Sequence, residues 1–220
     1  MFSHYYHGSI RKLVVAFGSL FNEIYISRKD ANGVEQNKIK VPISYGPKEK
    51  FVRKIRELDE ADPARSSVEN ILPRMSFEIS SMQYDSNRKL NSLNKTYSAR
   101  NETSGTISYA YGEVPYTFDF SLNIMNRNID DGYQIIEQIL PFFTPDFTIS
   151  MNFTELDKKI DVPIVLTSVS TTEDYEGDLA ERRLITHNLL FQAKSFVYGP
   201  IKRSGVIREI DLTFRELTDE

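Results

Sequence analysis

The chain has 220 residues, of which 40% are hydrophobic and 26% charged, and its 27 basic and 31 acidic side chains give a net charge of −4. This balance is typical of a globular protein that is long enough to bury a proper core. No block of basic residues is present, so sequence-independent binding to nucleic acid has little support, and the absence of cysteine excludes disulfides, thiolate metal sites and cysteine nucleophiles.

The first predicted element is an amphipathic helix close to the N-terminus. Its apolar stripe consists of Ile10, Leu13, Val14, Phe17, Leu20 and Phe21. Arg11 and Lys12 resemble the charged start of a signal peptide, but no small-residue cleavage site follows and the apolar run is too short to cross a bilayer. We therefore expect a helix of the folded protein here and no membrane segment.

Two strands and a second helix are predicted next. A strand starts at Ile24 and Ile26, residues 30–33 supply a turn, and a return strand follows. The apolar face of the return strand consists of Ile39, Val41, Ile43 and Tyr45. Gly46 and Pro47 then open a helix, because proline suits the first helical position. The buried stripe expected of this helix is Phe51, Val52, Ile55 and Leu58.

A near-repeat of six residues marks two joints between a helix and a strand. The motif VENILP at residues 68–73 returns as IEQILP at residues 136–141. Proline disfavours the helical conformation for the residue before it, so Leu72 and Leu140 are predicted helix ends. The motif offers one carboxylate, one amide and aliphatic side chains, and therefore indicates organisation rather than chemistry.

A strand over residues 75–79 follows the first copy, and its apolar phase then shifts to Met82 and Tyr84, which predicts a bulge near Ser80 and Ser81. Residues 85–115 are polar and show no clear periodicity. A stretch of this length predicts a functional loop or a partly disordered segment. Its aromatic residues without an evident core are Tyr97, Tyr109 and Tyr111.

Residues 116–124 show the cleanest alternation in the chain, and a helix capped near Asp130 follows. The apolar face predicted for that helix is Ile129, Tyr133, Ile136 and Leu140. Further strands are expected at residues 147–153, 160–168, 184–197 and 206–214, with an acidic turn at 173–178.

The whole chain, residues 1–220, is therefore predicted to be a single α+β domain. It would have a mixed or antiparallel sheet packed against about three helices and a long polar loop. The core residues expected are Phe17, Ile55, Phe118, Phe120 and Ile136.

The sequence offers little reactive chemistry. His4 and His7 lack a third metal ligand, and His187 is in phase with the apolar residues of its strand, as expected of a core histidine. The acidic turn at 173–178 does not match an EF-hand loop, and neither a phosphate-binding loop nor a nucleophile elbow is present. We therefore predict no enzyme activity, no cofactor, and no catalytic or metal-binding residues.

Five collinear stretches carry a resemblance to a known family: FSHYY (2–6), GSLFNEI (18–24), KVPISYGPKE (40–49), VENILPRM (68–75) and IIEQILPFF (135–143). The later pair Arg182 and Arg183 extends the match. In this order the stretches resemble the tail sheath stabiliser and completion proteins, the tail terminators, of contractile-tailed bacteriophages. The resemblance covers nearly the whole chain to about Pro200, whereas residues 85–115 match poorly.

The resemblance implies a structural virion protein of the tail and neck that is assembled in the host cytoplasm. Members of the family form a hexameric ring on the head-proximal end of the tail tube and sheath. The ring ends polymerisation, stabilises the sheath and joins the tail to the head. The implied partners are other copies of the chain, the tail tube protein, the tail sheath protein and the neck proteins, and DNA would pass through the ring only as cargo.

Cyclic assembly requires contact surfaces rather than a catalytic group, and tyrosine suits such surfaces because it combines apolar area with a hydroxyl. The candidate interface residues are Tyr5, Tyr6, Tyr97, Tyr109, Tyr111, Arg182 and Arg183. Alternatives are a tail-tube or other neck subunit, a protein-binding module outside viruses, and a hydrolase whose site is assembled from scattered residues. Tube or sheath subunits would stack indefinitely, whereas a terminator would form rings.

Overall fold

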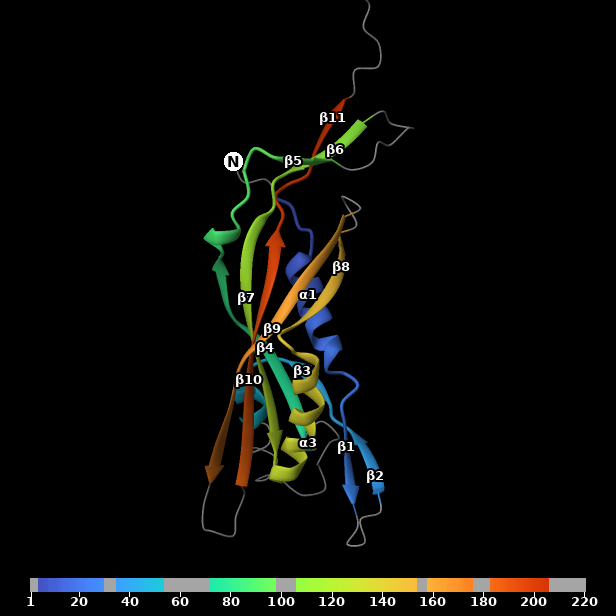
Figure 1. Ribbon diagram of the computed structural model, residues 1–220, viewed down its shortest axis with the longest axis vertical. Coiled ribbons are helices and arrows are strands. Elements are labelled where there is room, and N and C mark those ends of the chain that lie inside the picture. Colours follow the sequence, from blue (N-terminus) through green and yellow to red (C-terminus); the bar gives the residue numbers. More distant parts are fainter. Residues whose placement is uncertain are drawn as a thin grey trace, which may run out of the picture.

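A twisted six-stranded sheet runs along the molecule and a smaller three-stranded sheet lies at one end, as Figure 1 shows for the computed structural model. The structure describes residues 4–29, 35–53, 72–97, 106–153, 158–175 and 183–205. In spatial order the large sheet contains β3 (Ile43–Tyr45), β4 (Arg74–Tyr84), β7 (Val114–Asn126), β10 (Arg183–Val197), β9 (Lys158–Tyr175) and β8 (Asp146–Phe153). Neighbouring strands are antiparallel except for the parallel pair β3 and β4. The predicted α+β class is confirmed.

Two helices pack on the apolar face of the large sheet, one along each half of its length (Figure 1). They are α1 (Ser9–Leu20) and α3 (Ile129–Ile139), and the 3-10 turn η4 (Leu140–Phe142) continues α3. A further helix starts at Lys48, and its described part ends at Arg53. Beside α3 lies a hairpin of β1 (Tyr25–Lys29) and β2 (Glu35–Lys40).

Phe17 of α1 is the centre of an aromatic core. Its ring stacks on that of Phe120 with centroids 4.3 Å apart, and the rings of Phe77 and Phe191 lie 5.5 Å and 5.4 Å away. Gly18 allows this approach, since an added Cβ would lie 2.7 Å from the Phe77 ring. Phe17 is buried, as predicted. Phe118, Phe120 and Ile136 are buried as expected, whereas Ile55 lies outside the described residues. Ile10, predicted to belong to the buried stripe, is exposed.

The predicted apolar face of the third helix is wrong by part of a turn. Its buried isoleucines are Ile135, Ile136 and Ile139, whereas Tyr133 and Leu140 are 50% and 40% exposed. Both sets have helical spacing and share Ile136, so periodicity alone does not separate them. The cap predicted near Asp130 is Asn128, whose side chain accepts a hydrogen bond from the Asp130 backbone N–H.

The return strand expected after the first turn is divided between two sheets. β2 ends at Lys40 and pairs with β1, whereas β3 starts at Ile43 and runs parallel to β4. Pro42 causes the break, because it has no N–H for a ladder and its carbonyl oxygen instead accepts a 2.8 Å hydrogen bond from the Met75 N–H. The predicted bulge is confirmed, since the register of β4 shifts between Ile79 and Ser81.

The polar stretch 85–115 contains regular structure that the sequence analysis did not predict. It includes the 3-10 turn η3 (Ser86–Arg88), β5 (Lys95–Tyr97) and β6 (Thr106–Tyr111). β5 and β6 form the small sheet together with β11 (Lys202–Gly205), in the order β11-β6-β5. The strands were missed because polar residues occupy both faces, and because β11 lies about ninety residues further along the chain.

Other predictions concern the last strands of the chain and the two hexapeptide copies. β9 extends to Tyr175, so Glu173 and Asp174 of the expected acidic turn are strand residues and the rest of that turn lies outside the described residues. The strand expected at 206–214 also lies outside them, as does most of the first hexapeptide copy. In the second copy, α3 ends at Ile139, one residue before the predicted Leu140.

Candidate protein interaction surfaces

The small sheet is fixed to the large one by hydrogen bonds at the points where the chain passes between them. Tyr198, between β10 and β11, donates a 2.6 Å hydrogen bond to Glu113 Oε2, between β6 and β7. Burial, together with this carboxylate, raises the pKa of Tyr198, so the phenol stays protonated and able to donate. The bond therefore holds the two connections side by side.

Arg88 of η3 attaches the segment between β4 and β5 to the large sheet. It donates a 2.7 Å hydrogen bond to Asp85 Oδ2 and a 3.2 Å bond to the carbonyl oxygen of Tyr116, and its guanidinium carbon lies 5.1 Å from the centroid of the Phe196 ring. The hydrogen bond from Arg88 lowers the pKa of Asp85. The start of the predicted loop is thus tied to β7 and β10.

The strand register of the small sheet places tyrosine and lysine side chains on one face. Tyr109 of β6 is opposite Tyr97 on one side and Lys202 on the other, and Tyr111 is opposite Lys95. Directly opposed residues of paired strands point to the same side of a sheet, as do residues two apart on one strand. These five residues define what we call the Tyr–Lys face.

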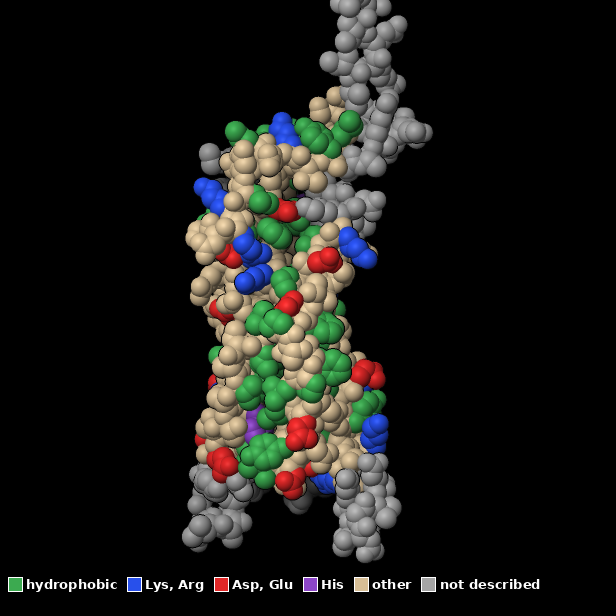
Figure 2. Space-filling model, viewed as in Figure 1, with side chains coloured by type: hydrophobic (Ala, Val, Ile, Leu, Met, Phe, Trp, Pro, Cys, Tyr) green, Lys and Arg blue, Asp and Glu red, His purple; other side chains and the backbone are tan. Residues whose placement is uncertain are grey.

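The rings of the Tyr–Lys face contact one another and its lysines. Tyr109 lies 6.0 Å from both Tyr97 and Tyr111, measured between centroids, with interplanar angles of 43° and 77°. Lys95 Nζ is 4.9 Å from the Tyr109 centroid and 5.5 Å from that of Tyr111, and Lys202 Nζ is 5.4 Å from the latter. Figure 2 shows hydrophobic and basic side chains together at this end of the molecule.

The face is open to solvent, whereas its reverse side contacts the molecule. Tyr97 is 59% exposed and Tyr111 is 39% exposed, while Ala110, which points to the other side, is buried in the main core cluster. Within the described part of the chain, the hydroxyls of Tyr97, Tyr109 and Tyr111 make no hydrogen bond. An exposed aromatic surface with free donors is typical of protein interfaces.

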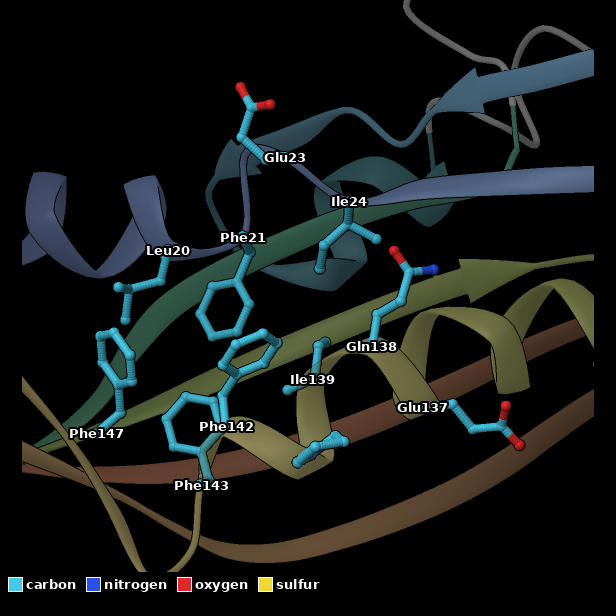
Figure 3. Close-up of a pocket in the computed structure, with 11 residues that line it drawn as sticks. Leu20, Phe21, Glu23, Ile24, Glu137, Gln138, Ile139, Phe142, Phe143 and Phe147 are labelled. Atoms are coloured by element: carbon cyan, nitrogen blue, oxygen red, sulfur yellow. The ribbon is translucent and has the colours of Figure 1, made fainter.

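A second surface is an apolar groove between the end of α1 and the end of α3 (Figure 3). It has a volume of about 610 Å³, and Phe142, Phe143 and Phe147 form one side of it while Leu20 and Phe21 form the other. Phe142 is 65% exposed. Glu23 and Glu137 line the rim and point away from the aromatic rings (Figure 3). The groove has the shape and chemistry to receive apolar side chains of a partner.

Comparison with known proteins gives these surfaces a context. The family model described as the T4-like virus Myoviridae tail sheath stabiliser matches residues 4–220. The chain belongs to this family. It is similar to the tail completion protein gp15 of Enterobacteria phage T4, with 34% identity over 214 residues that cover 94% of this chain and 77% of the relative. The protein is therefore a structural component of a bacteriophage tail, and the resemblance noted from the sequence is confirmed.

In this tail sheath stabiliser the predicted interface residues do not form one site. Tyr5 and Tyr6 lie in the N-terminal arm, at the same end of the molecule as the small sheet (Figure 1), and Tyr6 is 71% exposed. The arm is attached by His7, whose Nε2 lies 2.9 Å from the carbonyl oxygen of Gly199. Arg182 lies outside the described residues. Arg183 starts β10 at the opposite end of the molecule (Figure 1).

Some residues of the candidate surfaces were missed in the sequence. Lys95 and Lys202 belong to the Tyr–Lys face only because β5 and β11 flank β6, which the polar sequence did not reveal. The groove had a visible signal, because the run Leu140 to Phe143 at the end of the second hexapeptide is more apolar than a helix end requires. The hexapeptide also has a structural role, since Gln138 Nε2 donates a 2.7 Å hydrogen bond to the Tyr25 carbonyl oxygen and joins α3 to β1.

His187 is a core residue, as predicted. Its side chain is fully buried, its Nδ1 lies 2.8 Å from Thr171 Oγ1, and desolvation lowers its pKa. Among the residues that the structure describes, no three His, Asp or Glu side chains lie close enough to hold a metal ion. In the same part of the chain, no helix is both long enough and apolar enough to cross a membrane.

Proposed function

We propose that six copies of the chain form a closed ring that caps the tail tube and sheath, ends tail polymerisation, stabilises the last sheath ring and joins the tail to the neck and head. Its partners would be the tail tube, tail sheath and neck proteins. Assembly would take place in the host cytoplasm, and DNA would cross the ring only as cargo. The observation that carries the proposal is the family match over residues 4–220. We also propose that the protein acts without enzyme activity.

The described surfaces support this proposal because they are separate and unlike one another. The Tyr–Lys face is polar and aromatic, and it lies at one end of the molecule, whereas the groove around Phe142 is apolar and lies beside the two helices. A cyclic assembly uses heterologous contacts, in which one patch of a subunit meets a different patch of the next. A capping ring needs further surfaces for the components above and below it.

The test is the mass and shape of the assembled protein. We expect light scattering to give a mass near six times the 25.4 kDa of one chain, in the free protein or after addition of tail tubes. Negative-stain microscopy should show closed rings that do not grow into tubes. Long tubes would instead indicate a tube subunit, and a protein that stays monomeric with and without tail tubes would contradict the proposal.

Phe142→Asp tests whether the groove contributes to subunit contact. Phe142 is 65% exposed, so the substitution should leave the fold intact while placing a charge in an apolar contact. Val15→Asp is the matched control, because Val15 of α1 is 64% exposed and lies outside the groove lining. We expect Phe142→Asp to reduce the ring fraction and the control to keep it. Equal losses would assign the effect to added charge rather than to the groove.

A further inference from the structure

Among the residues that the structure describes, the lysines of the Tyr–Lys face have no anionic partner. Lys95 and Lys202 make no ion pair in the part of the chain that the structure describes, and both are exposed. Each ammonium group is instead held over a tyrosine ring at 4.9 to 5.5 Å from the centroid. Such cation–π contacts restrict the position of a lysine side chain without neutralising its charge. The face therefore presents positive charge and phenol donors side by side.

We propose that the Tyr–Lys face binds an acidic segment of a partner protein. This inference rests on the proposed function, in that the partner would be another component of the tail or neck that meets this end of the subunit. Carboxylates would accept hydrogen bonds from the lysine ammonium groups and from the free hydroxyls of Tyr97, Tyr109 and Tyr111. Aliphatic parts of the same segment would cover the exposed ring surface.

The geometry favours an acidic protein segment over nucleic acid. Proteins that bind single strands offer ring faces on which successive bases stack, together with a cationic groove that follows the phosphates. Here Tyr109 and Tyr111 are inclined at 77° to each other, and lysine ammonium groups already lie near the faces of both rings. Arg203 of β11 is opposite Ser108 and follows Lys202 in the strand. Successive residues of a strand point to opposite sides, so Arg203 points to the reverse side of the sheet and adds no charge to this face.

The net negative charge of the chain means that an acidic segment would bind only at a local cationic surface. At −4 the protein as a whole repels an acidic polymer, so any binding must come from a local cationic surface. Individual exposed ion pairs contribute little, and the two lysines alone would give weak binding. The tyrosines supply the remaining contact area, which predicts that lysine and tyrosine substitutions both weaken the interaction.

The experiment measures binding of the full-length protein to two labelled probes by fluorescence anisotropy at low salt. The probes are a short poly-L-glutamate and an oligodeoxythymidine of equal charge. We expect poly-L-glutamate to bind more tightly, and the double variant Lys95→Glu, Lys202→Glu to bind it roughly tenfold more weakly. The control is Lys50→Glu, Lys159→Glu, which changes the net charge equally at exposed lysines elsewhere and should change affinity much less.

Other results would overturn the inference. Tighter binding of oligodeoxythymidine would identify a nucleic-acid surface, and equal losses in the two double variants would show a general charge effect. Absence of poly-L-glutamate binding to the wild-type protein would also contradict it. The ring fraction of each variant, measured by light scattering, separates this inference from the proposed function. Rings that form without poly-L-glutamate binding would refute the acidic partner alone, whereas absence of rings both with and without tail tubes would refute the proposed function.

Discussion

The large sheet and the small sheet of this tail protein are stabilised in different ways. The large sheet is held by an aromatic core in which Phe17 stacks on Phe120 at 4.3 Å, and both helices add buried residues to it. The small sheet consists of strands of three, six and four residues, and Ala110 is its buried core residue in the described part of the chain. It is positioned by hydrogen bonds of Tyr198 and Arg88 rather than by a core of its own.

This difference indicates a division between stability and recognition. Burial of apolar area dominates the free energy of folding, so the large sheet should determine the stability of the whole protein. A sheet held mainly by exposed and half-buried hydrogen bonds opens at lower free energy, which suits a surface that adapts to a partner. The comparison therefore predicts large effects of substitution in the first region and small effects in the second.

Phe120→Ala should give the largest effect. Phe120 is fully buried and stacked on Phe17, and truncation of such a residue typically costs about 3–5 kcal/mol of unfolding free energy. Tyr97→Ala, in the small sheet, should change the same quantity by less than about 0.5 kcal/mol because its side chain is largely exposed. Urea denaturation of the two variants measures both values. Similar losses would show that the two sheets unfold as one equally stabilised unit.

Gly132→Ala should have the next largest effect. An added Cβ would overlap His187 Nε2 and lie 2.9 Å from Asn126 Nδ2, so α3 would have to move away from β7 and β10. Overpacking of this kind costs about 1–3 kcal/mol. Gly199→Ala is the control, because nothing lies within 4 Å of an added Cβ there, in the connection to the small sheet. A thermal midpoint that falls equally in both variants would contradict the close contact at Gly132.

His187, in β10 of the large sheet, predicts that the free energy of unfolding depends on pH. Desolvation lowers its pKa in the folded protein below the ordinary 6.5, against a smaller opposing effect of Glu173. The unfolded chain therefore binds a proton first as the pH falls, and stability decreases below about pH 6.5. His187→Gln should remove this component. Unfolding free energies measured between pH 7.5 and 5 test the slope, which should be shallower in the variant, although its stability at pH 7.5 can differ.

Periodicity predicted the elements that face the large core. The stripe around Leu13 and Phe17 and the alternation of Phe118 and Phe120 succeeded because each apolar side chain contacts a common core. The histidine at 187 was placed in the core by the same alternation. The third helix failed because two stripes share Ile136, and the choice between them depends on where the sheet lies rather than on spacing.

The small sheet and the groove depend on contacts between distant segments. β6 is paired with β11 across about ninety residues, so Lys202 and Tyr109 become neighbours through topology alone. These strands give no clear alternation, because one face is exposed and Ala110 is the only residue of the other that is fully buried in the described part of the chain. The groove likewise forms only when the end of α1 meets the run that ends in Phe142 and Phe143. Sequence patterns predicted the tyrosines as interface residues, whereas their arrangement with the lysines required the fold.

The triple variant Tyr97→Ser, Tyr109→Ser, Tyr111→Ser should have a small effect on stability and a large effect on assembly. The three rings contact mainly one another and two lysines, so their loss should change the unfolding free energy by no more than about 1 kcal/mol. If the Tyr–Lys face binds a tail or neck component, complementation with this variant should yield few infectious particles, with uncapped or headless tails visible by microscopy. Ser108→Ala, Thr96→Ala, on the reverse side of the same sheet, is the matched control and should complement fully. Normal particle yield from the tyrosine variant would show that the small sheet is a passive spacer, and a loss of stability as large as that of Phe120→Ala would show that it belongs to the core.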